Sequence, residues 1–474
     1  MTRILALVAL VLAALVGCGG DDSAAVGTDS AATIAPASAP MFASIDSDLS
    51  SDQWQQLDEL LQRFPGRDRL VDELRSSLAG EGVSADEIDE AFGPTVDVVV
   101  LDLEDEGAGV FLTKTEDVES LKALLAKGDD EWVTEQLDDG WVGFSDEQSS
   151  IDALKAGSGK AALADDEQFD DAMAKLPDQA LAKLYVDGEA VAGELGRLGG
   201  GASIPQVNGK LIAAAAAVVA EDSGVRLKVY AKGDGSTEAP DVGELLEDVP
   251  DGVIAFANFG LGGTADEVEK ALESQPGAKE SLDMAEAMLG LSLDDLTSLF
   301  RDEAVLYVRP GVLIPEVTLV VKTDGAEGKR TVDRLLEAAT KLTGGETRST
   351  EVDGLPGTEV SLGPVSIYVV ADGDRVIVST LERGIADYRS DGDKLQDDGR
   401  YEDALDASGV GGDEDVYLYV DIDETYGLVE RLLQLADEPV PSEVDENVEP
   451  LRAVVVSGKV DGDETESSIF LSLD

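Results

Sequence analysis

The sequence predicts an α+β protein of two duplicated domains, each a mainly antiparallel sheet with helices packed on one face. Three observations lead to this prediction. Two ordered segments from the first half of the chain return in the second half. Strand-like apolar runs follow one another without a helix between them, which is the order expected of antiparallel sheets. Hydrophobic residues make up 43% of the 474 residues, enough to build buried cores in a chain of two-domain length.

The chain begins with the features of a secretory signal peptide. One basic residue, Arg3, precedes a run from Ile4 to Gly17 that contains no polar side chain. This run is shorter than the roughly 18 apolar residues of a membrane-spanning helix, and its length suits the apolar part of a signal peptide. We therefore predict that residues 1–17 are removed from the mature protein.

The apolar run ends at Leu15-Val16-Gly17-Cys18, which resembles the lipobox of bacterial lipoproteins. The resemblance implies cleavage between Gly17 and Cys18 and attachment of lipid to Cys18. Several acyl chains on one cysteine would hold the protein firmly on the outer face of the cytoplasmic membrane. The alternative is a plain signal peptide in which Cys18 is an ordinary small residue. Cys18 is the only cysteine, so the mature chain has no internal disulfide.

The mature chain is predicted to start with a lipidated flexible tether over 18–36. These residues are small and polar, and they offer too little apolar surface to fold by themselves. The first domain is then predicted over 37–238 and its duplicate over 239–474. The boundary falls in a polar stretch rich in turn-forming residues.

The first matched pair of segments joins a short helix to a strand. Ser84 is followed three residues later by Glu87, and Ser292 is followed in the same way by Asp295. A serine three residues before an acid is typical of a capped helix N-terminus. The helices are predicted over 83–92 and 291–300, and the strands that follow over 96–101 and 304–308, 208 residues apart at their starts.

The second matched pair joins another helix to a strand of the Leu-Tyr-Val-Asp type. Residues 165–173 lead into a strand over 182–187, and residues 397–405 lead into a strand over 416–421. The offsets are now 232 to 234 residues. A loop inserted around 340–357 accounts for the difference.

The remaining predicted elements keep the same order in both copies. Strands are expected over 41–45, 109–113, 141–145 and 225–232, and over 253–259, 316–323, 376–380 and 467–473. Helices are expected over 51–61, 68–78 and 117–126, and over 265–273, 281–289 and 329–341. The alanine-rich run over 211–220 is predicted to be a buried helix, because ten residues are too few to span a membrane.

Charge and composition exclude several classes of function. The chain has 100 acidic and 35 basic residues and no histidine, a formal net charge of −65. Such a surface repels nucleic-acid phosphates, so no nucleic-acid partner is expected. It also repels anionic lipid head groups, so we expect the lipid anchor to make the membrane contact. Without histidine, Ser-His-Asp triads and histidine metal sites cannot form.

Calcium is the one metal for which the sequence offers candidate ligands, because Ca²⁺ binds clustered carboxylate oxygens. Asp421, Asp423 and Glu424 follow the second Leu-Tyr-Val-Asp strand and form such a cluster. Their spacing does not fit a helix-loop-helix calcium site, and a solvated turn is the alternative. No other cofactor is expected apart from the lipid on Cys18.

The strand-helix-strand order and the repeated Leu-Tyr-Val-Asp strands extend over most of the mature chain. In these features the chain resembles an exported bacterial envelope family called domain of unknown function 3352. The resemblance implies an often duplicated architecture and a location outside the cytoplasm. It implies no activity, because the family has none established.

Three classes of function remain. The favoured hypothesis is a non-enzymatic envelope lipoprotein that binds a partner protein or a wall component. The second is a carrier that holds an apolar ligand between sheet and helices, which requires a cavity lined by Leu, Val and Ala. The third is a hydrolase that uses carboxylates alone, which requires two facing acids in a cleft and a raised pKa for one of them.

Overall fold

A computed structural model of the chain describes two compact units. Described are residues 30–69, 71, 84–103, 108–128, 131–158, 161–191, 210–235, 242–260, 292–311, 314–323, 325–363, 365–412, 414–435 and 440–474. Unit 1 comprises Met1–Thr237, Ser442–Pro450 and Val460–Asp474, and unit 2 comprises Glu238–Pro441 and Leu451–Lys459. These units group residues by their contacts, whereas the predicted domains 37–238 and 239–474 are the two copies of a duplication. The units therefore do not test the predicted domain limits, which stay a prediction.

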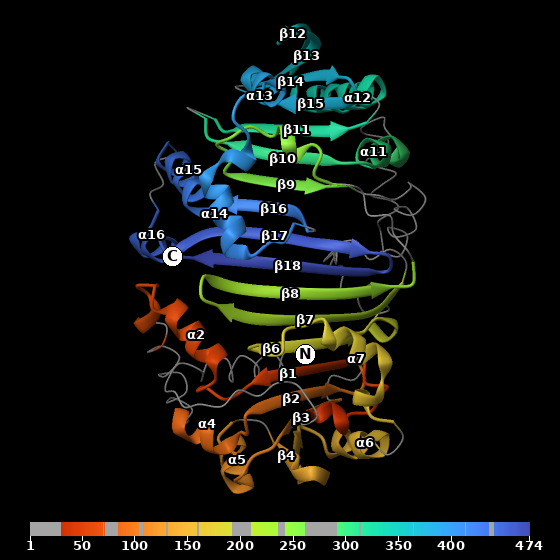
Figure 1. Ribbon diagram of the computed structural model, residues 1–474, viewed down its shortest axis with the longest axis vertical. Coiled ribbons are helices and arrows are strands. Elements are labelled where there is room, and N and C mark those ends of the chain that lie inside the picture. The colour runs from red at the N-terminus through yellow and green to blue at the C-terminus, as the bar shows by residue number, and fades with distance from the viewer. Residues whose placement is uncertain are drawn as a thin grey trace. The chain divides into compact units, whose positions relative to one another are not determined.

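The described strands of unit 1 pair in an antiparallel sheet that includes the last strand of the chain. In order of pairing they are β4 (Val133–Gln136), β5 (Val142–Ser145), β3 (Gly109–Thr113), β2 (Thr95–Val100), β1 (Met41–Asp46), β6 (Ala182–Asp187), β7 (Leu211–Glu221), β8 (Gly224–Gly233) and β18 (Glu464–Leu473). Figure 1 shows the long strands β7 and β8 side by side.

Helices cover both faces of this sheet. The described helices of unit 1 are η1 (Ala31–Thr33), α2 (Asp52–Leu61), α4 (Ala85–Ala91), α5 (Val118–Leu125), η2 (Asp138–Gly140), α6 (Gln148–Ser158), η3 (Leu163–Asp165), α7 (Glu167–Ala174) and α16 (Ser442–Val448). On one face Val99 and Leu112 pack with side chains of α6 and α7. On the other face Val98 and Phe111 pack with side chains of α4 and α5.

The prediction that the helices pack on one face is therefore wrong. Strand β2 is buried at four consecutive positions, so its side chains are covered on both sides of the sheet. A strand that is apolar at successive positions, without alternation, is typical of a sheet covered on both faces. That signal was present in the run from Val96 to Leu101.

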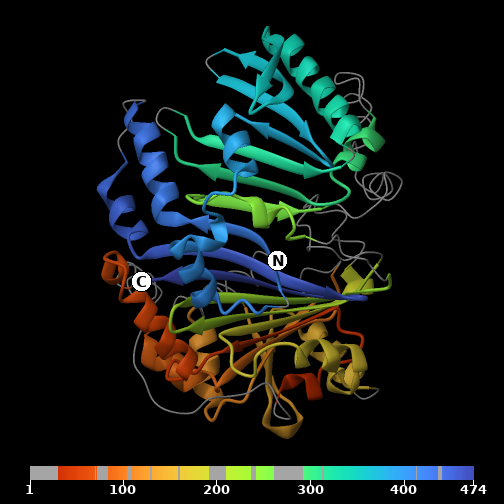
Figure 2. The ribbon, with the colours of Figure 1, turned by 45° about the horizontal axis from the view of Figure 1, so that its top comes forward.

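The described strands of unit 2 also pair in antiparallel order. In order of pairing its strands are β12 (Glu346–Val352), β13 (Leu355–Leu362), β14 (Val365–Asp372), β15 (Arg375–Ser379), β11 (Glu316–Lys322), β10 (Ala304–Arg309), β9 (Ala255–Phe259), β16 (Asp415–Asp421) and β17 (Leu451–Asp461). Its helices are η4 (Leu246–Asp248), α11 (Leu293–Leu299), α12 (Gly325–Thr343), α13 (Glu382–Arg389), η5 (Leu395–Asp397), α14 (Gly399–Ser408) and α15 (Ile422–Leu435). Figure 2 shows α12 along the strands β13 to β15 that it contacts.

The loop predicted to be inserted around 340–357 is a β-hairpin. The end of α12 is followed by β12 and β13, which pair with each other and then with β14. Asp353 and Gly354 form the turn, with φ values of 48° and 78°. An Asp-Gly pair with both φ values positive favours a tight two-residue turn, and this pair is visible in the sequence.

Both predicted capped helices are confirmed. At the start of α4 the Ser84 backbone N–H donates to Glu87 Oε2 over 3.0 Å, and Ser84 Oγ accepts from the Glu87 N–H. At the start of α11 the Ser292 N–H donates to Asp295 Oδ2 over 3.0 Å, and the Asp295 N–H donates to Ser292 Oγ over 3.1 Å. The same local chemistry therefore precedes β2 and β10.

The predicted helix over 211–220 is wrong, because these residues form the strand β7. β7 lies between β6 and β8 and pairs with both. Ala213, Ala215 and Ala217 face the core, where α7 packs against the strand. The preference of alanine for helix is weak compared with two strand partners, and a row of small side chains lets a helix approach closely.

Other predicted features lie outside the described residues. These are the signal peptide, Gly17 and Cys18, the helices over 265–273 and 281–289, and most of the helix over 68–78.

Candidate functional site

The segment that leads into the sheet of unit 1 is packed into the core. We call residues 30–40 strap 1. Ala31 and Ala35 in this strap are fully buried and belong to the same core as α6 and α7. The predicted flexible tether over 18–36 is therefore wrong for residues 30–36. Their small side chains cannot form a core by themselves, but they pack against the sheet of unit 1.

Backbone hydrogen bonds fix strap 1 beside η3. The Leu163 N–H donates to the Ala35 carbonyl over 2.8 Å, and the Ala37 N–H donates to the Ala161 carbonyl over 3.0 Å. The contact is a short antiparallel bridge at Pro36. Strap 1 thus has a defined path before β1 begins.

A buried carboxylate on β2 holds the start of strap 1. Asp97 is fully buried, and the Ala31 N–H donates to Asp97 Oδ2 over 2.7 Å. Ser44 lies opposite Asp97 in the pairing of β1 with β2. Burial raises the pKa of Asp97 to about 6, and hydrogen bonds from Ser44 and the Ala31 N–H offset only part of this rise. Asp97 therefore binds a proton more tightly in the folded protein than an exposed aspartate does.

The segment that leads into the sheet of unit 2 follows the same kind of path. We call residues 242–250 strap 2. The Leu395 N–H donates to the Val249 carbonyl over 2.9 Å, and the Asp251 N–H donates to the Asp393 carbonyl over 3.1 Å. Strap 2 is thus bridged to the residues before η5 as strap 1 is bridged to those before η3.

Strap 2 is also held by a buried carboxylate. Glu303, which immediately precedes β10, is 1% exposed. Its two oxygens accept hydrogen bonds from the Gly243 N–H over 2.6 Å and the Leu245 N–H over 2.9 Å. Burial raises the pKa of Glu303, and the hydrogen bonds from these amides and from Asn258 counter the rise.

The two carboxylates lie near each other's equivalent place in their sheets, with Glu303 two residues before the position that matches Asp97. Ser44 pairs with Asp97 across β1 and β2, and Asn258 pairs with Val305 across β9 and β10. Glu303 comes two residues before Val305, and residues two apart along a strand point to the same face. Each unit therefore places a polar side chain, a carboxylate and the amides of its strap together.

The straps differ in charge. Strap 1 contains no ionisable side chain. Strap 2 contains Glu244, which pairs with Lys322 and Arg375, and Asp248, which also pairs with Arg375. Strap 2 therefore has side-chain ion pairs in addition to its carboxylate, whereas strap 1 is held by apolar burial, backbone bonds and Asp97.

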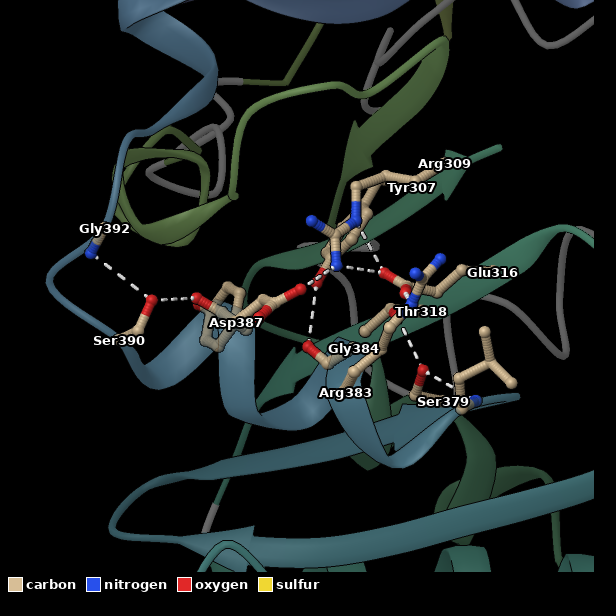
Figure 3. Close-up of polar contacts among 12 residues, drawn as sticks. Tyr307, Arg309, Glu316, Thr318, Ser379, Arg383, Gly384, Asp387, Ser390 and Gly392 are labelled. Carbon is tan, nitrogen blue, oxygen red and sulfur yellow. Dashed lines mark hydrogen bonds and ion pairs between the residues drawn. The ribbon is translucent and has the colours of Figure 1, made fainter. Parts of the chain in front are cut away.

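Unit 2 contains a second polar feature, which we call the arginine–carboxylate cluster (Arg309, Glu316, Arg383 and Asp387). Glu316 is fully buried at the start of β11. Arg309 Nε donates to Glu316 Oε1 over 2.6 Å, and Arg383 Nε donates to Oε2 over 2.8 Å. Figure 3 shows Arg309 extending from Glu316 to Asp387 on α13. The cluster ties α13 to β10 and β11.

Unit 1 has no ionisable side chains at the matching strand positions. Arg309 pairs with Glu316 at one end of the β10–β11 ladder. At the corresponding end of the β2–β3 ladder the Leu101 N–H donates to the Ala108 carbonyl. A buried ion pair is often no more stabilising than an apolar pair of similar volume. The cluster is thus a particular property of unit 2 and not a requirement of this type of sheet.

Gly384 allows α13 to approach the sheet beneath the cluster. A Cβ at this position would lie 2.3 Å from Ser379 Oγ and 2.7 Å from Thr318 Oγ1, and these two hydroxyls are hydrogen-bonded to each other over 2.8 Å. We expect Gly384→Ala to destabilise unit 2 by about 1–3 kcal/mol, as overpacking does in well-filled cores. Denaturant unfolding followed by far-ultraviolet circular dichroism measures the change.

Gly427 in α15 provides the matched control, because a Cβ there meets no atom within 4 Å. Gly427→Ala should be neutral or stabilising by up to about 1 kcal/mol, from helix propensity. Equal effects of the two substitutions would contradict the close packing at Gly384.

The predicted calcium ligands face an arginine. Arg400 Nη1 lies 3.2 Å from Asp421 Oδ2 and 2.9 Å from Glu424 Oε1. Asp421 also accepts the Glu424 N–H over 2.9 Å at the start of α15. Among the described residues no group of three or more acidic side chains is placed to hold a metal ion. We therefore propose no calcium site at Asp421, Asp423 and Glu424.

The carboxylates that form these contacts were not among the predicted site residues. Asp97 has a sequence signal, a single charge inside an otherwise apolar strand. Glu303 and Glu316 stand at strand ends, where carboxylates usually face solvent, so the sequence gives no reason to expect their burial. Their roles depend on which backbone amides and arginines the fold brings to them.

These features define an α+β protein with antiparallel sheets, in which buried carboxylates fix the segments that enter the sheets. The chain belongs to the family described as protein of unknown function (DUF3352), whose model matches residues 104–473. The family resemblance of the sequence is thereby confirmed. In the described part of the chain, no helix combines the length and apolar character needed to cross a membrane.

Comparisons with curated sequences and with solved structures identify no further relative of the chain. No curated protein sequence matches the chain. Crystal form IV of TP0453 is 8% identical and has a TM-score of 0.22, with 42% of this chain and 79% of that chain covered. The 5-dimethylallyltryptophan synthase from Streptomyces coelicolor is 12% identical with a TM-score of 0.14, with 52% and 77% covered. TM-scores this low do not establish a shared fold.

Proposed function

We propose that the protein is a lipid-anchored envelope protein that binds a partner protein or a wall component and has no catalytic activity. The anchor is Cys18, exposed by removal of residues 1–17, on the outer face of the cytoplasmic membrane. Strap 1 begins at Ser30, twelve residues beyond Cys18.

We infer that residues 37–238 and 239–474 arose by duplication. The central strand β1 lies between β2 and β6, as β9 lies between β10 and β16. The serine-capped helices recur before the matching strands β2 and β10, and in each case a buried carboxylate on or next to that strand binds the entering strap. Agreement in pairing, capping and strap geometry supports common descent more strongly than the sequence matches alone.

The non-catalytic part of the proposal rests on how the buried carboxylates are used. A hydrolase without histidine needs two acids that face a substrate, one with a raised pKa. Burial raises the pKa of Asp97 and Glu303, but each binds backbone amides of its strap. Glu316 is bound by two arginines. These contacts hold strap 1, strap 2 and α13 in place, which supports a structural role for the three carboxylates.

Charge supports a partner with basic groups. The formal net charge of −65 favours attraction of a cationic surface and repels nucleic acid. For the carrier hypothesis, one described hollow lies beside Ile34 and Leu154 in unit 1, with Glu135, Asp138 and Lys155 in its wall. Its volume of about 140 Å³ is below the range of roughly 300–1,000 Å³ usual for ligand pockets. A second described hollow in unit 1 has a volume of about 610 Å³, and its wall is mostly polar: Gln53, Pro177, Asp178, Gln179, Val219, Ala220 and Glu221. Neither hollow has the Leu, Val and Ala lining that a carrier requires, so the binding hypothesis is favoured.

The anchor is tested by intact mass. The chain isolated from membranes of a bacterium that processes lipoproteins should have lost residues 1–17 and gained acyl chains. Cys18→Ala should gain no acyl chains, because the substitution removes the thiol to which the lipid would be attached. Ser23→Ala, a neighbouring substitution outside the lipobox, should behave as the wild type. A wild-type mass with unmodified Cys18 would rule out the anchor.

The binding activity is tested with a chain that begins at Ser30 and carries no lipid. It should co-sediment with isolated cell walls, or form specific crosslinks to an envelope protein in intact cells. The supernatant is analysed by mass spectrometry for released wall fragments. Release of fragments would overturn the non-catalytic proposal, and absence of both retention and crosslinks would overturn the binding proposal.

A further inference from the structure

The last two strands of each predicted copy have the same lengths. β7 and β17 each have 11 residues, and Leu451 at the start of β17 comes 240 residues after Leu211 at the start of β7. β8 and β18 each have 10 residues, and Glu464 again comes 240 residues after Gly224. A turn of two residues precedes both β8 and β18. β8 and β18 are therefore equivalent strands, and each closes its copy.

These two equivalent strands pair with each other, within unit 1, in a symmetric register. They run antiparallel over nine residue pairs, side by side in Figure 1. The central pair joins Lys228 to Ser468, which are equivalents 240 residues apart, and four pairs follow on either side. An antiparallel contact in which a residue meets its own equivalent at the centre is the isologous contact of a two-fold dimer.

The two halves of this strand pair bury their side chains in the same way. Tyr230 and Phe470 are equivalents, and both rings are fully buried. Phe470 lies opposite Arg226, whose guanidinium is 4.6 Å from the ring centre. Tyr230 has the ammonium group of Lys175, at the end of α7, 5.4 Å from its ring centre. Each half therefore buries one aromatic ring beneath one cation, an attractive arrangement.

We propose that the edge of β8 is an interaction surface that fits the closing strand of a second copy of this domain, and that charge reserves it for β18 in this chain. The proposal builds on the inferred duplication. It depends neither on the lipid at Cys18 nor on the envelope partner, so its failure would leave the proposed function untouched.

Charge explains why β8 takes β18 and not the β8 of another chain. β8 carries three basic and no acidic residues, whereas β18 carries two acidic and no basic residues. Lys228 Nζ lies 3.7 Å from Glu466 Oε2, and Lys232 Nζ lies 3.6 Å from Glu464 Oε1. Two β8 strands in the same register would place Lys228 opposite its own copy, and like charges at opposite positions are destabilising. The complementary charges thus select the strand of the same chain.

The register is tested with pairs of cysteines in the mature chain, in which Cys18→Ala removes the only other thiol. Lys228→Cys with Ser468→Cys should close a disulfide within one chain, because directly opposite residues lie within disulfide range. Lys228→Cys with Ser472→Cys is the matched control. Ser472 lies opposite Gly224, about 13 Å along the strand from the central pair, so its disulfide should form roughly tenfold less. Equal yields, or no disulfide in the first variant, would overturn the symmetric pairing.

The choice of partner is tested by displacing β18. Ser468→Pro disrupts the centre of β18, because proline has no N–H and does not fit inside a sheet. Combined with Lys228→Cys, which also removes the clash of two lysines, it should give dimers linked by a disulfide between the introduced cysteines. Combined with Lys232→Cys it should give roughly tenfold less linked dimer, because two such positions would lie about 26 Å apart in the same register. Lys228→Cys without Ser468→Pro should stay monomeric.

Equal dimer yields from the two cysteine positions, or no dimer from the Lys228→Cys variant in a folded chain, would overturn the proposal. Linked dimer from Lys228→Cys with β18 intact would overturn the role of charge. Tryptophan fluorescence verifies folding, because all three tryptophans belong to unit 1. If Ser468→Pro does not fold, Glu464→Lys with Glu466→Lys displaces β18 by repulsion from β8, and the same outcomes decide.

Discussion

Replacing Phe470 with alanine is expected to lower the free energy of unfolding of unit 1 by about 3–5 kcal/mol. Phe470 lies on β18, is 1% exposed, and has the Arg226 guanidinium 4.6 Å from its ring centre. β18 pairs with β8 over nine residue pairs. A residue near the C-terminus therefore completes a sheet whose other strands come from the first half of the chain.

Tryptophan fluorescence during denaturant unfolding measures this effect selectively. The three tryptophans, Trp54, Trp132 and Trp141, all belong to unit 1. Ile469→Ala is the control, because Ile469 is the neighbour of Phe470 but is 40% exposed, and its loss should change stability by no more than about 0.5 kcal/mol. A tryptophan transition that Phe470→Ala leaves in place would falsify the assignment of β18 to unit 1.

Glu316→Ala is expected to destabilise unit 2 by about 3–5 kcal/mol, the usual cost of breaking a buried ion pair from one side. Arg309, whose side chain is 12% exposed, would lose its buried partner and keep only Asp387. Exchange of the β10 and β11 amides in increasing denaturant measures the loss. The tryptophan transition should stay unchanged, because unit 2 contains no tryptophan.

The double substitution Arg309→Leu with Glu316→Ala separates stability from a more specific role. It gives unit 2 the residue types that unit 1 has in Leu101 and Ala108 at the matching pair. We expect it to recover most of the loss, to within about 1–2 kcal/mol of the wild type, because a buried ion pair and an apolar pair are often similar in stability. A double variant as unstable as the single one would mean that the charges themselves stabilise α13 on the sheet.

Local sequence chemistry predicted much of the secondary structure. Ser84 and Ser292 mark the starts of capped helices because a side-chain oxygen and an acid three residues later satisfy backbone amides within one turn. Such contacts form between near neighbours, so the sequence contains all the partners. The Asp353-Gly354 turn was not predicted, although its residue types alone favour the backbone angles that it adopts.

Predictions failed where a partner distant in sequence decides the outcome. The run over 211–220 is a strand because β6 and β8 flank it, and neither is recognisable from the alanines themselves. Residues 30–36 pack because a sheet formed by later residues provides the surface. The covering of both sheet faces was visible in continuous apolar strands, but which helix covers which face depends on chain topology.

The sequence by itself determined the α+β class, the capped helices, most strands, the acidic character and the absence of histidine chemistry, because these follow from composition and neighbouring residues. Only the tertiary structure decided that Asp97 and Glu303 bind the amides of two entering segments, that Glu316 is buried between two arginines, and that β18 belongs with β8. The reason is physical: the pKa and the role of a carboxylate depend on solvent exclusion and on donors brought from distant parts of the chain.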